Sequence, residues 1–191
     1  REMKHQVGNR ASITIPQGLD MWKPPKEGSR TIDVIAFCVV DNDRFSSQVN
    51  YADPGDWYGE RTFFTHRSVG IEEQSFTCSL KTFGKPCPIC EKRAKYLDMP
   101  DNESQEIAKA LKPSERQLFL IVDHENREKG IQLWEVATFY FGKGLDIYIQ
   151  GSKKNKPKYM QYFHPIDGYS ITFTVVEGNY GNEFRVHSFE K

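Results

Sequence analysis

The chain has 191 residues, and its 26 Lys and Arg balance its 26 Asp and Glu, so the formal net charge is zero. It contains no apolar run near the roughly 18 residues of a membrane span, and no charged-then-apolar signal segment opens it. We therefore expect a cytoplasmic protein that is not inserted in a membrane. Because the chain is not uniformly basic, a nucleic-acid partner would require Lys and Arg to gather on one face.

The amino-terminal part of the chain is polar and rich in turn formers. Residues 1–15 predict a flexible arm, and residues 18–29, with Pro24-Pro25 and Gly28, predict an extended loop. Trp22 in this loop is interpreted as folded back over the core, with stacking on a nucleic-acid base as the alternative.

Runs of β-branched and aromatic residues then predict a series of short strands. The predicted strands span residues 31–40, 57–66, 74–78, 116–123, 131–141, 169–177 and 183–189. Such a series within a single domain of 191 residues predicts a mainly β fold, an antiparallel barrel or sandwich.

Between these strands the sequence predicts connections of several kinds. One amphipathic helix is expected at 103–112, a helical turn after Cys90, and a hairpin turn at 126–130. Residues 145–150 fit a helix or a strand equally well. The remaining connections are predicted as polar loops and turns at 41–56, 81–86, 153–158 and 178–182.

One histidine and three of the four cysteines lie between His66 and Cys90, in the order His66, Cys78, Cys87 and Cys90. Structural zinc sites take four Cys or His ligands in a tetrahedron, and a Cys-x-x-Cys turn presents two sulfurs to one ion. In a cytoplasmic protein this pattern favours metal-bound thiolates over disulfides. The sequence therefore predicts one structural Zn²⁺ ion on these four residues.

Two details of this assignment have alternatives. The fourth ligand is assigned to His66, although His124, His164 and His187 are candidates for the same role. Cys38 lies inside the predicted strand 31–40 and is interpreted as a buried thiol outside the metal site.

The motifs do not favour an enzyme. A full tetrahedron leaves no position for an activated water. The turn that ends in Cys90 matches the second half of the zinc-deaminase signature, but Arg67-Ser68 follow His66 where that signature has a catalytic Glu. A magnesium-dependent nuclease is the remaining enzymatic alternative, and its candidate carboxylates are the pairs Asp41/Asp43 and Glu72/Glu73.

Basic and aromatic side chains recur close together along the chain. Single-stranded nucleic acid is held by positive side chains along its backbone and by flat rings under its bases. Alternation along strands turns about half of the aromatic residues toward the core. The candidate nucleic-acid contacts are Tyr58, Arg61, Phe64, Arg67, Lys81, Phe83, Lys85, Lys92, Arg93, Lys95, Tyr96, Arg116, Phe139, Tyr140 and Lys143.

The order of these features resembles the single-stranded DNA-binding proteins of T-even bacteriophages. Their histidine, cysteine and Cys-Pro-x-Cys turn match His66, Cys78, Cys87 and Cys90, and three downstream segments are also similar, Leu118–Gly130, Tyr140–Leu145 and Tyr169–Gly178. The resemblance covers roughly residues 25–190. It implies one oligonucleotide-binding (OB)-fold-like antiparallel barrel over residues 1–191, with a zinc subdomain inserted at 57–112. It also implies sequence-independent binding of single-stranded DNA in phage DNA replication, recombination and repair.

The chain departs from that family in several places. The loop between Cys78 and Cys87 is about one residue shorter, and Glu115-Arg116 replace an aromatic pair. The basic amino-terminal arm and the acidic tail of the family lack full counterparts here. Self-association along DNA and recruitment of replication proteins therefore stay open as partners, and an RNA-binding or transcription-associated zinc module is the alternative function.

Overall fold

The computed structural model describes residues 13, 15–38, 55–150, 159–178 and 181–191. The arm predicted at 1–15, the polar loops at 41–56 and 153–158, and the turn at 178–182 therefore lie wholly or partly outside the described residues, as do Asp41 and Asp43. The chain divides into two compact units. The smaller comprises residues 1–14 and 64–114, and the larger comprises residues 15–63 and 115–191.

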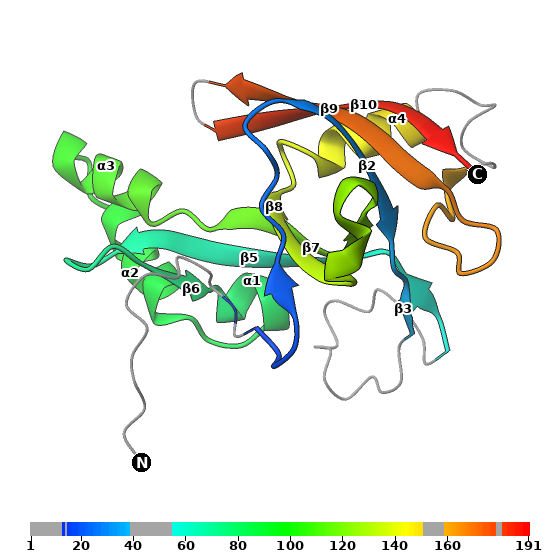
Figure 1. The fold of residues 1–191 in the computed structure, drawn as a ribbon. Helices are drawn as coiled ribbons and strands as arrows, with labels where there is room; N and C mark the ends of the chain where they lie inside the picture. Colours follow the sequence, from blue (N-terminus) through cyan, green and yellow to red (C-terminus); the bar gives the residue numbers. More distant parts are fainter. Residues whose placement is uncertain (1–12, 14, 39–54, 151–158, 179–180) are drawn as a thin grey trace, which may run out of the picture. The chain divides into compact units, whose positions relative to one another are not determined.

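The larger unit is built on a twisted sheet that is mainly antiparallel (Figure 1). Its strand order is β1-β8-β7-β2-β9-β10, and only β1 and β8 run parallel. A separate two-stranded sheet pairs β3 with β4. The strands are β1 (Asp20–Met21), β2 (Gly28–Val34), β3 (Phe37–Cys38), β4 (Trp57–Tyr58), β7 (Ser114–Asp123), β8 (Gln132–Ala137), β9 (Ser170–Gly178) and β10 (Gly181–Glu190).

The sheet is not closed into a barrel, which corrects the OB-fold-like barrel expected from the sequence. Across the described ranges, the strand order ends at β1 on one side and at β10 on the other. The β1 edge is short because pairing with β8 stops after Trp22, whose backbone N–H donates to the Leu133 carbonyl at 2.7 Å. Pro24 and Pro25 follow, and proline has no N–H to extend a ladder. The predicted mainly β character with a few helices is confirmed.

The core of this unit forms on one face of the sheet because apolar residues alternate along its strands. On β9, Ile171, Phe173 and Val175 are buried while the residues between them are half-buried. The centre of the core is Trp134 on β8, whose ring lies 4.5 Å from that of Phe141, centroid to centroid. Aromatic rings therefore gather around Trp134, and aliphatic side chains such as Ile32 and Ile121 complete the core.

Trp22 belongs to this core, which confirms its predicted position. Its side chain is 5% exposed, and its ring centroid lies 4.9 Å from that of Trp134. The indole Nε1 donates a hydrogen bond to the Asp123 carboxylate at 3.0 Å. A buried indole N–H needs such an acceptor, so this bond fixes the segment after β1 against the end of β7.

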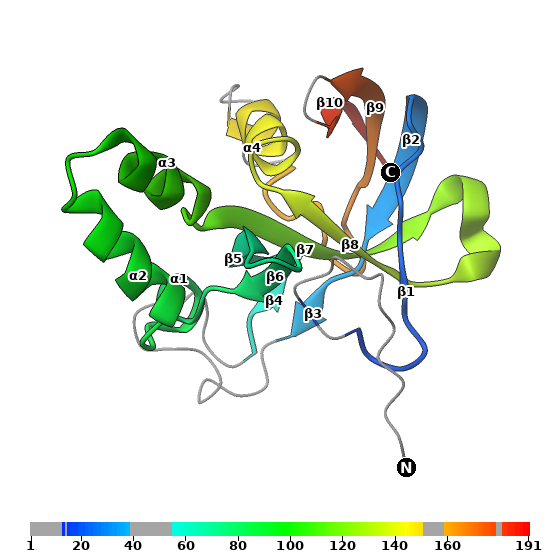
Figure 2. The same cartoon turned by 90° about the vertical axis from the view of Figure 1, so that its left-hand side faces the viewer.

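The chain between β7 and β9 is more helical than predicted. The expected hairpin turn is a 3-10 helix, η1 (His124–Lys129), and the strand expected at 131–141 ends at Ala137. Helix α4 (Gly142–Gln150) follows and resolves the ambiguity at 145–150. It buries Leu145 and Ile149 in the core and lies beside β10 (Figure 2).

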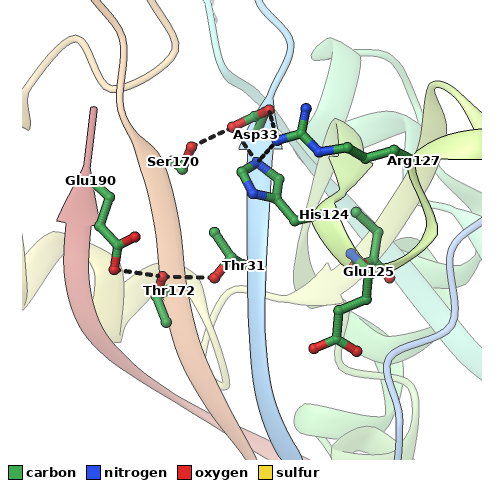
Figure 3. Close-up of polar contacts among 9 residues, drawn as sticks. Thr31, Asp33, His124, Glu125, Arg127, Ser170, Thr172 and Glu190 are labelled. Atoms are coloured by element: carbon green, nitrogen blue, oxygen red, sulfur yellow. Dashed lines mark hydrogen bonds and ion pairs between the residues drawn. The ribbon is translucent and has the colours of Figure 1, made fainter.

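Polar side chains connect β2, β9 and η1 on the surface of this unit (Figure 3). Ser170 donates a hydrogen bond to the Asp33 carboxylate at 2.5 Å, and His124 Nε2 lies 2.9 Å from the same carboxylate. The hydroxyls of Thr31 and Thr172 lie 2.9 Å apart across the two strands. Burial raises the pKa of Asp33, but the bonds from Ser170 and His124 outweigh burial, so the pKa falls below its usual value.

In the smaller unit, the described residues form one β-hairpin and three short helices. Strand β5 (Glu60–Val69) begins in the larger unit and pairs from Thr65 onward with β6 (Gln74–Thr77). The helices are α1 (Ser79–Phe83), α2 (Pro88–Leu97) and α3 (Asn102–Ala110), and α2 and α3 lie side by side in Figure 2. The predicted helical turn after Cys90 is therefore part of α2, and α1 occupies part of the expected loop at 81–86.

Candidate metal centre

The β5–β6 hairpin brings His66 and Cys78 together although eleven residues separate them in the sequence. His66 pairs with Phe76 across the two strands, and Cys78 follows directly after β6. The backbone N–H of Cys78 donates to the Phe64 carbonyl at 2.7 Å, which continues the ladder by one bond. Two of the four predicted ligands are thus positioned by strand pairing alone.

The other two predicted ligands lie at the start of α2. Cys87 is the residue that caps the amino terminus of this helix, Pro88 is its first residue, and Cys90 lies in its first turn. Proline is favoured at the first helical position because its missing N–H has no partner there in any case. The partial positive charge of a helix amino terminus stabilises thiolates. The Cys-Pro-Ile-Cys sequence therefore forms the helix start and presents both sulfurs.

Cys78 lies in a similar position at the start of α1. Its sulfur accepts a hydrogen bond from the backbone N–H of Lys81 at 3.4 Å, so Cys78 caps this short helix. The helix ends at Gly84, whose φ of 65° is in the left-handed region that favours glycine. This geometry turns the chain from Cys78 back toward Cys87.

The four side chains form one buried cluster in which all ligand atoms lie within 4.8 Å of one another. The Sγ atoms of Cys78 and Cys90 are 3.5 Å apart, and His66 Nε2 lies 3.4 Å from Cys87 Sγ and 3.5 Å from Cys90 Sγ. Tetrahedral zinc with ligand bonds of about 2.0–2.3 Å has ligand–ligand separations of about 3.3–3.8 Å. The cluster is therefore consistent with a single metal ion such as zinc.

His66 is oriented for this role by a second contact. Its side chain is fully buried, and its Nδ1 lies 2.8 Å from the backbone carbonyl oxygen of Leu111, just after α3. A carbonyl accepts only, so Nδ1 carries the proton and Nε2 keeps its lone pair toward the sulfurs. Histidines that bind metals commonly have such an outer partner.

The thiols of Cys87 and Cys90 differ in their tendency to ionise. Burial raises the pKa of Cys87, but hydrogen bonds from the backbone N–H groups of Cys90 and Ile89 favour the thiolate, and the pKa is lowered to about 6. Burial raises the pKa of Cys90 to about 12, with a further contribution from the nearby Cys78 and Cys87 sulfurs. Three sulfurs at this distance do not all ionise without a compensating cation. A divalent metal supplies that charge, so the donor set fits zinc.

Two of the three alternatives for the fourth ligand, His124 and His164, lie outside this cluster. Among the described residues, His66 is the histidine of the metal-ligand cluster. His124 and His164 belong to the larger unit. Nothing in the structure describes the side chain of His187. Cys38 is also outside the cluster, as predicted, but it is exposed in β3 rather than buried. The predicted strand 31–40 is not continuous, because β2 ends at Val34 and β3 begins at Phe37, and Cys38 is the last residue described before position 55.

The basic and aromatic candidates of the smaller unit are mostly at its surface. Lys92 lies over the ring of Tyr96, with its Nζ 5.0 Å from the ring centroid. Arg93 is half-buried and donates to the Ala108 carbonyl at 3.1 Å, which connects α2 to α3. Phe64 and Tyr96 are half-buried, whereas the exposed candidates of this unit are Arg67, Lys81, Phe83, Lys85, Lys92 and Lys95.

The candidates of the larger unit differ more widely in their surroundings. Phe139 is 69% exposed, and Lys143 Nζ lies 5.1 Å from its ring centroid. Tyr140 packs partly against the core, and Arg116 is largely covered in a 3.0 Å ion pair with Glu135. Tyr58 stacks on Phe37, and Arg61 is half-buried. Phe139 and Lys143 are thus the pair that remains most available to a ligand.

Two exposed aromatic residues were missed by the sequence reasoning, Trp57 (50% exposed) and Phe76 (43% exposed). Trp57 directly precedes the candidate Tyr58, and Phe76 lies inside the predicted strand 74–78, so strand alternation is the signal that would have indicated them. No helix in the described ranges combines the length and the apolar character needed to cross a membrane. A scan against models of known protein families finds no match, and a search of curated proteins finds no similar sequence.

Proposed function

We propose that this chain is a non-enzymatic, sequence-independent single-stranded DNA-binding protein that acts in phage DNA replication, recombination and repair in the host cytoplasm. One observation carries the proposal. The four residues on which the family resemblance depends, His66, Cys78, Cys87 and Cys90, meet in one buried cluster of the size of a zinc site. A chance similarity of sequence gives no reason for these side chains to converge.

Zinc has a structural role in this proposal. The ion, when bound, joins the β5–β6 hairpin to the amino terminus of α2 with four protein ligands. The Leu111 carbonyl orients His66, and the Cys78 sulfur caps α1. Cys87 occupies the N-cap position of α2 without a capping hydrogen bond from its side chain. Because the protein fills all four positions, the site has no place for a catalytic water.

The surface chemistry also supports binding of a single strand. Rings with a lysine ammonium over them occur in both units, at the exposed Phe139 with Lys143 and at the half-buried Tyr96 with Lys92. A ring supplies a stacking platform for any base, and the ammonium supplies a phosphate contact. Neither contact depends on the base sequence of the strand, which agrees with sequence-independent binding.

The proposal is tested by fluorescence anisotropy with a labelled oligo-dT, a duplex of the same length and a structured RNA. We expect tight binding of oligo-dT and of a mixed-sequence single strand, and much weaker binding of the duplex. Affinity should fall steeply with added salt, because basic side chains release counterions from the phosphates.

Each alternative has its own outcome in the same assay. Equal affinity for duplex and single strand would contradict the proposal, and preference for the RNA would favour an RNA-binding zinc module instead. Cleavage of the labelled strand on addition of magnesium would indicate a nuclease. The zinc content of the same sample shows whether a negative result comes from protein that lacks its metal.

A further inference from the structure

We infer that the larger unit has a second ligand site, a pocket that binds the phosphate group of a nucleotide. The pocket has a volume of about 300 Å³ and lies among the segment after β1, the start of β2 and the η1 turn before β8. This volume is at the small end of the range for small-molecule sites, roughly 300–1,000 Å³. The inference is independent of the proposed function, because it rests on other residues.

Positive charge dominates the lining of this pocket. Lys23, Arg30 and Lys129 contribute three cations and Asp123 one carboxylate, a formal charge of +2. Arg30 is paired with Glu125 at 2.8 Å, whereas neither lysine has an ion pair within the described ranges. Two exposed lysines at one pocket are suited to a phosphate group, which offers several acceptor oxygens.

Three neutral donors hold the carboxylate of Asp123 in place, and no ion pair joins it to either lysine in the described ranges. It accepts hydrogen bonds from Trp22 Nε1, from the Glu125 backbone N–H and from Asn126 Nδ2, at 3.0, 3.0 and 3.1 Å. These bonds also hold the pocket wall in place without a ligand. The site is thus rigid on the side formed by Trp22 and Asp123.

A buried amide provides the second, independent indication of a ligand. Gln132 lines the pocket and is 4% exposed, yet its Oε1 has no hydrogen-bond partner among the described residues. A buried carbonyl oxygen without a donor costs stability, so such atoms call for a bound group. A nucleotide supplies phosphate oxygens for the lysines, and its base N–H or sugar O–H reaches Gln132 once the amide turns toward the pocket, because Oε1 itself is closed to solvent.

The ligand chemistry has two possible sources, a free nucleotide or a nucleotide of a DNA strand. Both present a phosphate group beside a hydrogen-bond donor, and we infer that the pocket binds this combination of groups. The full-length chain is titrated with thymidine monophosphate, thymidine, inorganic phosphate and oligo-dT. The readout is the indole N–H resonance of Trp22 in a ¹⁵N spectrum, because that N–H bonds to the pocket carboxylate.

Thymidine monophosphate is expected to shift the Trp22 resonance in a saturable way, and thymidine without its phosphate is not. The double variant Lys23→Ala/Lys129→Ala should weaken this binding roughly tenfold or more, since two charge-assisted contacts are removed. Lys26→Ala is the matched control, because Lys26 is an exposed neighbour of Lys23 that does not line the pocket. No shift with thymidine monophosphate, or an equal loss in Lys26→Ala, would overturn the inference.

The oligo-dT titration separates the two sources. If the double variant also loses affinity for oligo-dT, the pocket holds a nucleotide of the strand. If oligo-dT binding is unchanged while monophosphate binding is lost, the pocket holds a free nucleotide. A wild-type chain that binds the monophosphate but no single-stranded DNA would refute the proposed function and leave this inference standing.

Discussion

The Nδ1 atom of His66 lies 2.8 Å from the carbonyl oxygen of Leu111 and thereby directs Nε2 at the sulfurs of Cys87 and Cys90. This contact joins β5 to the end of α3, so the metal cluster depends on residues well beyond the Cys-rich segment. It also selects His66 from the five histidines of the chain. The outer partner of His66 is a backbone carbonyl, so no particular side chain marks this contact in the sequence.

Replacing one cysteine of the cluster should remove the metal and destabilise the smaller unit. In Cys87→Ser we expect zinc content to fall from one ion per chain toward none, because the hydroxyl is a poor zinc ligand at neutral pH. Helices α1 to α3 should then melt at lower temperature than in the wild type, as measured by circular dichroism. Cys38→Ser is the control, since Cys38 lies outside the cluster. Full zinc content in Cys87→Ser would refute the ligand assignment.

The contact between Trp22 and Asp123 should make the stability of the larger unit depend on pH. Burial raises the pKa of Asp123, but the bond from Trp22 and two further donors outweigh burial and lower the pKa below its usual value. The ionised carboxylate therefore stabilises the fold above pH of about 4, and this contribution is lost as the pH falls through the lowered pKa.

Asp123→Asn tests that dependence by denaturant unfolding at several pH values. We expect the variant to lose about 1.5–3 kcal/mol at pH 7, the range for a hydrogen bond to a charged group. The difference from the wild type should shrink below pH of about 4. A difference that stays constant between pH 7 and pH 3 would show that the charge of Asp123 does not stabilise the fold.

Phe139 should contribute to affinity for single-stranded DNA without contributing to stability. Its ring is 69% exposed, so Phe139→Ala removes little from the core. Loss of one stacked base costs about 1–3 kcal/mol, which corresponds to roughly 5- to 150-fold weaker binding of oligo-dT. Ile166→Ala, at a position that is 87% exposed, controls for loss of a surface apolar group. Unchanged affinity in Phe139→Ala would remove this residue from the binding surface.

Gly142 at the start of α4 should not tolerate a side chain. A Cβ there would lie 2.6 Å from Cδ of Gln117, a buried residue of β7, so Gly142→Ala must displace that amide. Overpacking of this kind costs about 1–3 kcal/mol. The nearby Gly144→Ala is the matched control, because its Cβ would meet only the Phe184 carbonyl oxygen at 3.7 Å. A lower melting temperature for Gly144→Ala than for Gly142→Ala would contradict this packing.

Local patterns predicted the parts of the structure that depend on neighbouring residues. Alternation of apolar residues predicted β7 and β9, and the Cys-x-x-Cys turn predicted the sulfurs at the start of α2. Pro113 correctly indicated where the helix that contains Ala108 must stop. These elements are determined within a few residues, so one sequence was sufficient to find them.

The elements that depend on distant contacts were predicted less well. The strand through Trp134 ends at Ala137, where the chain turns and the Tyr140 N–H donates to the Ala137 carbonyl at 2.9 Å. Gly142 then lies close against Gln117, a contact that no local pattern reveals. Closure of the sheet depends on whether its two edge strands pair with each other. The sequences of β1 and β10 do not show which strands they pair with. The exposure of Cys38 was missed for the same reason, since within the described residues β3 pairs with β4, a partner distant in the sequence.

The central claim is that His66, Cys78, Cys87 and Cys90 form one closed zinc site, on which the proposed function depends. Zinc-edge X-ray absorption on protein purified without chelators, together with the metal content per chain, tests it most directly. We predict one zinc per chain with three sulfur ligands at about 2.3 Å and one nitrogen ligand at about 2.0 Å. Protein that is folded without metal, or zinc with an oxygen ligand in place of one of the four, would contradict the claim.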